Sequence, residues 1–334
     1  MFIVHSLPIA IVFCMVTMLG WGSWANTQKL AGRAKWPFEL FYWDYTLGVL
    51  FLTLIVGLTM GSNGASGKPF VADLAQVAPS SVYSALLGGA IFNLANILLV
   101  AAIDIAGMSV AFPVGIGIAL VLGVVVNYAA NPIGSAALLF SGVVLVVLAI
   151  ILDAVAYRKI PGGAAGVSTK GLILSVACGI LMGFFYRFVA ASMYPDFTHP
   201  EAGKLGPYAA VFIFAVGIFL SNFVLNTFLM KKPFVGTPVT YSDYFKGGPG
   251  THFTGILGGI IWGLGMSFNI IASGRAGFAI SYGLGQGATM VAAFWGVFIW
   301  KEFRTAPAGT SRLIAAMFGC FLVGLALIIL ARMS

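Results

Sequence analysis

The sequence predicts an all-α membrane protein in which ten transmembrane helices form two inverted five-helix repeats. Three observations predict this fold: ten long apolar runs, basic residues confined mainly to alternate connections, and a repeated glycine pattern. Among the 334 residues, 60% are apolar and only 8% are charged, whereas soluble domains contain about 25% charged residues. This composition excludes a cytosolic enzyme, a secreted disulfide scaffold, a disordered chain and a nucleic-acid-binding domain.

The apolar runs have the length that a bilayer requires, because a helix needs about 20 residues to cross the hydrocarbon layer. The first run has no positively charged segment before it, so we interpret it as a retained helix and not as a cleaved signal peptide. The predicted spans are Leu7–Asn26, Phe38–Met60, Val82–Ile103, Gly107–Ala129, Ile133–Val155, Gly171–Ala191, Gly206–Met230, Thr254–Ala272, Ala276–Trp300 and Leu313–Ala331.

The basic residues predict the orientation of these spans. Twelve lysines and arginines fall in the connections after the first, fifth, seventh and ninth spans, and four fall on the opposite side. Cytoplasmic loops carry an excess of such residues. We therefore predict a multi-pass protein of the cell (inner) membrane with both termini outside the cytoplasm, and we interpret the net charge of +8 as membrane topology.

A glycine pattern occurs twice in the chain. Residues 88–121 align without gaps to residues 258–291, at an offset of 170 residues, and five glycines fall on glycines. The offset carries spans three and four onto spans eight and nine, so each repeat holds five spans, and this odd number inverts the second copy. We predict a first repeat at 1–157, a cytoplasmic linker at 158–169, a second repeat at 170–334, and a substrate site between the repeats.

Pro113 lies inside the fourth predicted span. A proline in a helix interior removes a backbone hydrogen bond and bends the axis. The bend is open to two interpretations, a gating hinge or static packing.

Several spans carry polar and aromatic side chains at helical spacing, although polar groups are costly in hydrocarbon. Each such residue has two possible roles, an interhelical hydrogen bond or a solute contact. Together they suit a small, polar, uncharged solute that stacks on rings and forms hydrogen bonds. The candidate substrate-binding residues are Trp21, Trp24, Asn93, Asn96, Trp262, Asn269, Tyr282 and Gln286.

Asp44, in the second span, is the deepest acid in the chain. One interpretation is a proton-coupling or substrate-binding carboxylate that accepts hydrogen bonds from the neighbouring Tyr42 and Tyr45. The alternative is a structural acid near the membrane interface, paired with Lys29, Arg33 or Lys35.

No phosphate loop, nucleophile–base arrangement or metal-ligand spacing is present in the sequence. We therefore expect a secondary transporter and not an enzyme, with no cofactor and no metal site. The expected partners are a small-molecule solute, protons and the lipid bilayer, with no nucleic acid, and a single chain is expected to suffice.

Four segments resemble the ureide permeases, ten-helix members of the drug/metabolite transporter superfamily: LGWGSWANTQKLAGRAKWPFELFYWDYTLG, GGAIFNLANILL, AGMSVAFPVGIGIALVLGVVVNY and FWGVFIWKEFR. Glucose/ribose and rhamnose porters share the glycine pattern. The resemblance implies the drug/metabolite transporter fold, proton-coupled import of an oxo-heterocycle, nucleobase or ureide, and Asp44 as an important acid. The alternatives are a sugar porter or a multidrug/metabolite exporter of the same superfamily. The short connection Arg158–Ser168 departs from plant members, which have a long cytoplasmic loop there.

Overall fold

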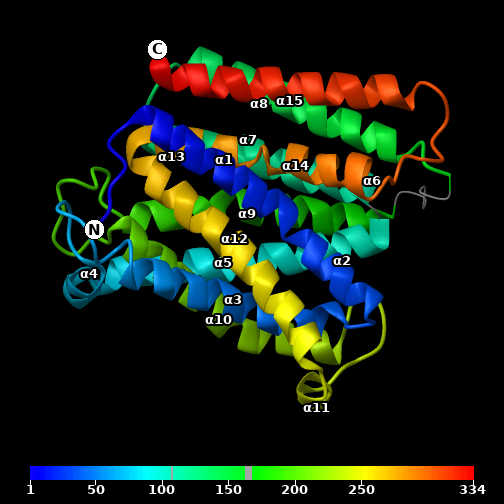
Figure 1. The fold of residues 1–334 in the computed structure, drawn as a ribbon, viewed down its shortest axis with the longest axis horizontal. Coiled ribbons are helices and arrows are strands. Elements are labelled where there is room, and N and C mark those ends of the chain that lie inside the picture. Colours follow the sequence, from blue (N-terminus) through cyan, green and yellow to red (C-terminus); the bar gives the residue numbers. More distant parts are fainter. Residues whose placement is uncertain (107, 162–167) are drawn as a thin grey trace.

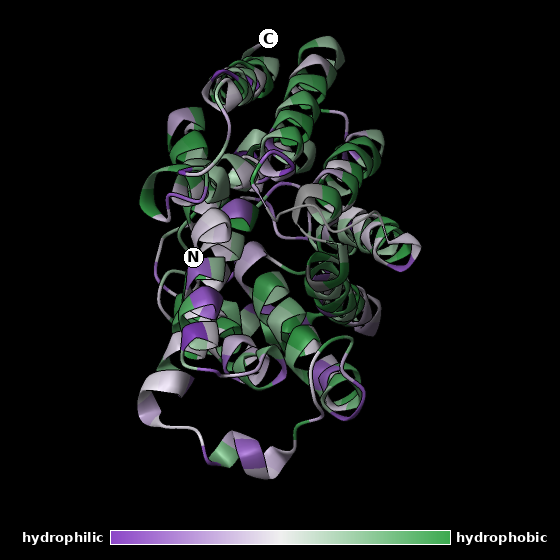
Figure 2. Cartoon of the chain, turned by 90° about the vertical axis from the view of Figure 1, so that its right-hand side faces the viewer, coloured by the Kyte–Doolittle hydropathy of each residue, from purple (hydrophilic) through white to green (hydrophobic). Residues whose placement is uncertain are grey.

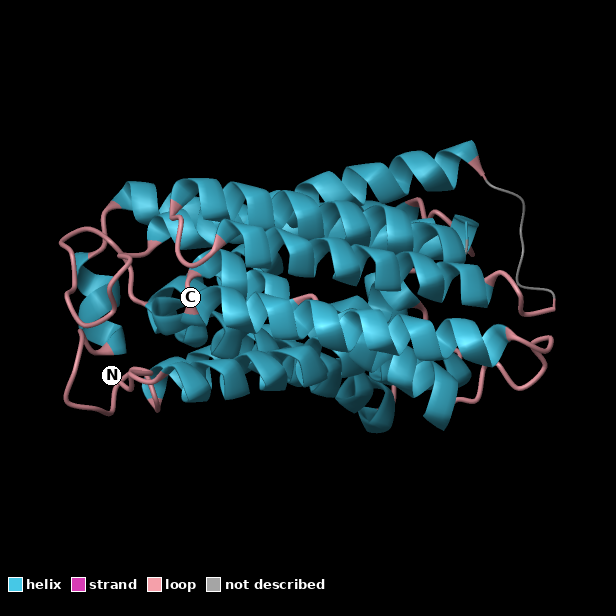
Figure 3. Cartoon of the chain, turned by 90° about the horizontal axis from the view of Figure 1, so that it is seen from above, coloured by secondary structure: helices cyan, strands magenta, loops and turns pink. Residues whose placement is uncertain are grey.

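The computed structural model describes residues 1–106, 108–161 and 168–334. Within these residues, ten helical segments are long and apolar enough to cross a membrane, which confirms the ten predicted spans. They run side by side, and their connections gather at the two ends of the bundle (Figure 3). Both termini lie at one end (Figure 1). Gly107 of the glycine pattern and residues 162–167 of the predicted linker lie outside the described residues.

In the first half, the second, third and fifth spans are single helices, and the first and fourth are built from shorter pieces. Two helices meet at Trp24, and a π-helical turn contains Pro113, at the place where a bend was predicted. The elements are α1 (Leu7–Ser23), α2 (Ala25–Arg33), α3 (Phe38–Leu58), the connecting helix α4 (Phe70–Gln76), α5 (Pro79–Ala106), α6 (Met108–Ala111), η1 (Phe112–Ile116), α7 (Gly117–Ala130) and α8 (Ala136–Tyr157).

In the second half, the ninth span is interrupted, and this corrects the prediction of one continuous helix over Ala276–Trp300. Gly277 has a φ of +90° and turns the chain after α12, and Gly285 and Gly287 flank the break at Gln286, because glycine weakens a helix. The elements are α9 (Thr169–Ser192), α10 (Pro207–Lys231), the connecting helix α11 (Tyr241–Phe245), α12 (Pro249–Ala276), α13 (Phe278–Gly285), α14 (Ala288–Phe294), η2 (Trp295–Ile299) and α15 (Thr310–Met333).

The helices of the two halves pack in matching ways. Helix α5 lies against α9 and α10, and α12 lies against α1 and α3. Glycines permit both contacts: a Cβ atom on Gly89 would overlap the carbonyl oxygen of Phe214, and one on Gly259 would overlap that of Tyr45. In membranes such small residues let helix backbones approach closely. This packing is the one that an exchange of the two halves requires.

The outer surface of the bundle is suited to lipid. Large apolar side chains such as Val144, Val224 and Leu322 are exposed there, and the hydropathy colouring of Figure 2 is green along much of the helices. An exposed apolar surface of this extent marks a membrane or partner interface in a folded protein. The chain is therefore a multi-pass membrane protein.

Candidate substrate cavity

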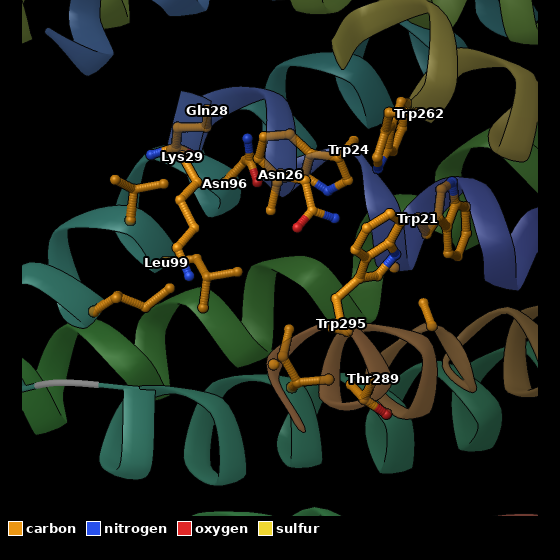
Figure 4. A pocket seen from close by; sticks show the side chains of 18 of the residues that line it. Trp21, Trp24, Asn26, Gln28, Lys29, Asn96, Leu99, Trp262, Thr289 and Trp295 are labelled. Carbon is orange, nitrogen blue, oxygen red and sulfur yellow. The ribbon is translucent and has the colours of Figure 1, made fainter. Parts of the chain in front are cut away.

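A cavity of about 440 Å³ lies between the two halves of the chain. Its wall draws residues from α1, α2, α5, α9 and α12 and from the interrupted ninth span. Figure 4 shows Trp21, Trp24, Asn96, Trp262 and Trp295 around it. Pockets for small molecules usually measure about 300–1,000 Å³, so this cavity is large enough for a compact solute.

Interrupted helices meet at this cavity. Trp24 lies at the junction of α1 and α2, Gln286 at the break between α13 and α14, and Trp295 at the start of η2. Backbone that departs from regular helix is tolerated at membrane depth where it lines a cavity or is buried in protein. Transporters build substrate sites from such discontinuous helices, so the backbone itself favours this place as the site.

One wall of the cavity is aromatic. The rings of Trp21 and Trp262 stack, with centroids 5.8 Å apart and planes inclined by 13°. Phe92 lies against Trp262 at a centroid distance of 4.4 Å, and Trp24 lies against Tyr45 at 4.9 Å. This wall offers ring faces to a planar solute.

Four amide side chains line the cavity, those of Asn26, Gln28, Asn96 and Gln286, and two of them are the predicted candidates Asn96 and Gln286. Asn96 Nδ2 donates to the Tyr42 hydroxyl over 3.2 Å, which leaves the Asn96 carbonyl oxygen as an acceptor. The Gln286 side chain lines the cavity and makes no hydrogen bond to any part of the chain that the structure describes. It therefore has both a donor and an acceptor for a ligand.

The charged end of the cavity was not predicted as a site. Lys29 Nζ lies 2.6 Å from Glu302 Oε1, and the Tyr157 hydroxyl donates to Glu302 Oε2 over 2.7 Å. The Lys29 ammonium also lies 4.3 Å from the centroid of the Trp300 ring. The sequence pointed to Lys29 as a topology signal and as a possible partner of Asp44. Glu302 belongs to the segment FWGVFIWKEFR, which could have drawn attention to it.

The structure brings together Trp21, Trp24, Asn96, Trp262 and Gln286 in the cavity wall, and it places the other three candidates elsewhere. Asn93 Nδ2 donates to Ser221 Oγ over 2.9 Å. Asn269 Nδ2 donates to the carbonyl oxygen of Ser281 over 2.8 Å. The Tyr282 hydroxyl lies 3.1 Å from the carbonyl oxygen of Ala119. These three side chains hold helices together.

Asp44 lies outside the cavity wall, and its partners differ from both sets that the sequence suggested. Tyr244 donates a hydrogen bond to Asp44 Oδ1 over 2.6 Å, and His252 Nδ1 lies 2.9 Å from Oδ2. Tyr42 is instead bonded to Asn96, and Lys29 to Glu302.

The partners of Asp44 lie about two hundred positions away along the chain, so no local pattern could have shown them. Tyr244 belongs to the connecting helix α11, outside the spans. Burial and the Asp44 carboxylate raise the pKa of its hydroxyl above the usual range. Among the described residues, no group of three histidine, cysteine or acidic side chains is placed to hold a metal ion.

Comparison with known proteins relates this fold to one family. A sequence model of the family described as ureide permease matches residues 41–160 and 165–331. Ureide permease 1 of Arabidopsis thaliana is 24% identical, over 98% of this chain and 98% of its own length. Probable ureide permease A3 of Vigna unguiculata is 24% identical, over 92% of this chain and 99% of its own length. A solved crystal structure with 17% identity superposes on 97% of the chain with a TM-score of 0.60 and covers 98% of its own chain, which shows the same fold.

Proposed function

This chain belongs to the ureide permease family, and we propose that it imports a small neutral solute with planar amide groups, a ureide, nucleobase or oxo-heterocycle, in symport with protons. The family makes it a membrane transporter and not an enzyme. The observation that carries the finer proposal is the cavity, where stacked tryptophans stand beside free amide groups.

The amide groups favour a solute that both donates and accepts hydrogen bonds. The Asn96 carbonyl oxygen can accept from a ligand N–H group, and the Gln286 amide can donate to a ligand carbonyl and accept from a second N–H. Ureides and oxo-heterocycles present these groups along one edge and have flat or nearly flat faces. A site built to bond such groups rejects analogues that lack them, because its buried polar atoms then stay unpaired.

The charge of the cavity favours a neutral solute. Lys29 is its one basic lining residue in the part of the chain that the structure describes, and Glu302 neutralises it. A carboxylate solute would have to displace Glu302 from Lys29 or remain unpaired in the cavity, and both alternatives are unfavourable.

Alternating access is supported by the matching packing of the two halves, which we propose to be inverted repeats at 1–157 and 170–334. In such transporters one half rocks against the other around a site near the midplane. The cavity extends from Trp21, in the middle of the first span, to Lys29 and Glu302 at one end of the bundle. That end carries the twelve basic residues, so we propose that it faces the cytoplasm and that both termini face outward across the inner membrane.

For proton coupling we propose Asp44 as one acid. Its side chain is 2% exposed, and its only basic partner within the described chain is a histidine, the side chain that changes charge nearest neutral pH. This buried pair joins α3 of the first half to α12 of the second, which is why we propose it for coupling.

Uptake by proteoliposomes tests the proposal. The labelled panel is allantoin, uracil, xanthine, glucose and rhamnose, with and without an inward proton gradient. We expect allantoin or one of the oxo-heterocycles to accumulate above the outside concentration only with the gradient. Accumulation of a sugar alone, or uptake that ignores the gradient, would contradict the proposal. Asp44→Asn is expected to lose gradient-driven accumulation and to retain solute exchange.

A further inference from the structure

Helix α13 is a separate segment of the ninth span, eight residues long. It begins after Gly277, whose φ of +90° turns the chain, and it ends at the break around Gln286. Gln286 lines the cavity, so one end of α13 adjoins the proposed solute site. Hinges are a few residues at the ends of elements, and α13 has such residues at both of its ends. It can therefore turn as a unit.

Helix α13 lies between the cavity and the end of the bundle that carries the two termini (Figure 1). It packs on α7, and a Cβ atom on Gly277 would lie 3.3 Å from Cβ of Ile133. The chain beside Ile133 joins the C-terminal helix, because the Ser135 backbone N–H donates to the carbonyl oxygen of Ala331 over 2.8 Å. The charged end of the cavity lies at the opposite end of α13.

A tyrosine ring fits α13 into a notch on α7. A Cβ atom on Gly123 would overlap the ring of Tyr282, so the ring occupies the space that a side chain at residue 123 would need. The Tyr282 hydroxyl bonds to the backbone of α7 and of α9, and the Ser281 hydroxyl lies 3.0 Å from that of Tyr186 on α9. Ser281 and Tyr282 are fully buried, so α13 closes this end of the cavity.

The first half of the chain holds a segment in the matching place. The offset of 170 residues carries residues 278–285 onto 108–115, which form α6 and most of η1. Gln286 falls on Ile116, which also lines the cavity. The two segments differ in their contacts, because α13 packs on α7 whereas α6 and η1 pack on α8 and α9. The cavity is closed on the side of α13, and at its charged end Lys29 is 40% exposed.

We propose that α13 is the gate at the outer end of the cavity and that residues 108–115 are the gate at the cytoplasmic end. This inference rests on the proposed function, because such a transporter opens its site to one side at a time. In the structure α13 is docked and the opposite gate is open. When α13 leaves the notch at Gly123, residues 108–115 take the matching place against α14. Gln286 and Ile116 follow the two gates, so a solute in the cavity lies beside both hinges.

A methyl group at Gly123 tests the outer gate. Gly123→Ala places a Cβ atom against the Tyr282 ring, so α13 should undock and the opposite gate should close. Gly319→Ala is the matched control, because nothing lies within 4 Å of a Cβ atom there. Two cysteine reporters, Ser281→Cys on α13 and Ala292→Cys in the cavity wall, are labelled with a maleimide in the purified, detergent-solubilised protein. Mass spectrometry reads each reporter at its own peptide.

The two reporters should respond in opposite directions. In Gly123→Ala, the labelling rate at residue 281 should rise about fivefold or more, the effect of about 1 kcal/mol on the gate equilibrium, and the rate at residue 292 should fall. Gly319→Ala should leave both rates unchanged. A merely loosened helix contact would raise both rates. Parallel increases, or unchanged rates in a folded Gly123→Ala variant, would overturn the proposal.

A disulfide between α13 and α7 keeps the test informative if Gly123→Ala does not fold. A Cβ atom on Gly283 would lie 3.3 Å from Cγ2 of Val124, so Val124→Cys combined with Gly283→Cys is within reach of a disulfide. In proteoliposomes, oxidation of the double variant should stop solute uptake, and reduction should restore it. Each single variant should transport under both conditions. Undiminished uptake by the cross-linked protein would show that α13 does not open.

Transport by the unaltered protein separates this inference from the proposed function. If that protein transports solute and the reporters do not respond in opposite directions, the paired gates are wrong and the proposed function stands. If it moves no solute while the reporters respond as expected, the proposed function fails and the paired gates stand.

Discussion

Asn93 and Asn96 lie one turn apart on α5, and they serve different regions of the molecule. Asn93 bonds to Ser221 and to the carbonyl oxygen of Ile218 in α10, so it joins two helices. Asn96 faces the cavity and keeps its carbonyl oxygen for a ligand. The same residue type therefore stabilises the bundle at one position and is available to a solute at the other. The role depends on whether a neighbouring helix or the cavity lies opposite the side chain.

Substitutions at the contacts between helices should disturb folding more than substitutions in the cavity wall. A Cβ atom on Gly259 would overlap the backbone of α3, so Gly259→Leu is expected to prevent α12 and α3 from packing and to abolish the folded protein. Gly319 on α15 is exposed, with no atom near its missing Cβ, and Gly319→Leu is the matched control. Size-exclusion chromatography of the detergent-extracted variants measures both outcomes, and a monodisperse Gly259→Leu would contradict the packing.

Tyr282→Phe should lower the stability of the helix contacts around Tyr282 by a measurable amount. The Tyr282 hydroxyl is fully buried, 3.1 Å and 3.2 Å from the carbonyl oxygens of Ala119 and Met182. These carbonyls already accept backbone hydrogen bonds within α7 and α9, so the variant loses one buried hydrogen bond between helices, at a cost of about 0.5–1.5 kcal/mol. Thermal unfolding should show the loss, and the solute affinity of the folded variant should be unchanged. A large drop in solute affinity with unchanged stability would contradict this assignment and indicate that Tyr282 contacts the solute.

Selectivity for neutral solutes should be relaxed when Lys29 loses its partner. In Glu302→Gln the Lys29 ammonium lies at the cavity without a counter-charge, so an anionic ureide such as allantoate should bind a few-fold more tightly than to the unaltered protein, as expected for a partly exposed charge. Competition against labelled allantoin measures the change. Lys29→Gln is the control, and an equal gain there would show that the ammonium plays no part.

The smallest effect is expected at Asp243 of α11, an exposed side chain that does not line the cavity. Bonds from Thr240 and Lys246 lower the pKa of the exposed Asp243 to about 2, and Thr240 and Asp243 form a capping box. Because the pKa is lower in the folded state, this contribution to the order of α11 is present above the usual value of 3.8 and is lost as the pH falls toward about 2. Hydrogen exchange of residues 241–245 should rise slightly in Asp243→Asn, and solute affinity should not change.

The fold was largely predictable from the sequence, because span length and basic connections are local properties. The interruption at Gln286 was missed, although Gly285 and Gly287 signalled it. The aromatic part of the site was also predictable. Trp21 and Trp24 lie on one face of the first span, and Trp262 lies on a polar and aromatic face of α12.

The roles of the polar residues were less accessible. Asn93, Asn269 and Tyr282 have the same spacing signals as Asn96 and Gln286, and only the tertiary structure shows which of them face a cavity. The partners of Asp44 and Glu302 come from distant segments: His252 and Tyr244 for the first, Lys29 and Tyr157 for the second. No periodicity within one helix reports such pairings.

Equilibrium binding of allantoin to Asn96→Leu and Asn93→Leu tests the central claim, that the cavity is the solute site. Tyr42→Phe is a further control, because it removes the bond to Asn96 and keeps the Asn96 carbonyl oxygen. We expect Asn96→Leu to bind about tenfold more weakly or worse, the effect of losing a bond worth about 1.4 kcal/mol or more. Asn93→Leu should bind as the unaltered protein does and unfold at a lower temperature. Equal affinities in the two asparagine variants, or a loss only in Asn93→Leu, would contradict the assignment of the cavity.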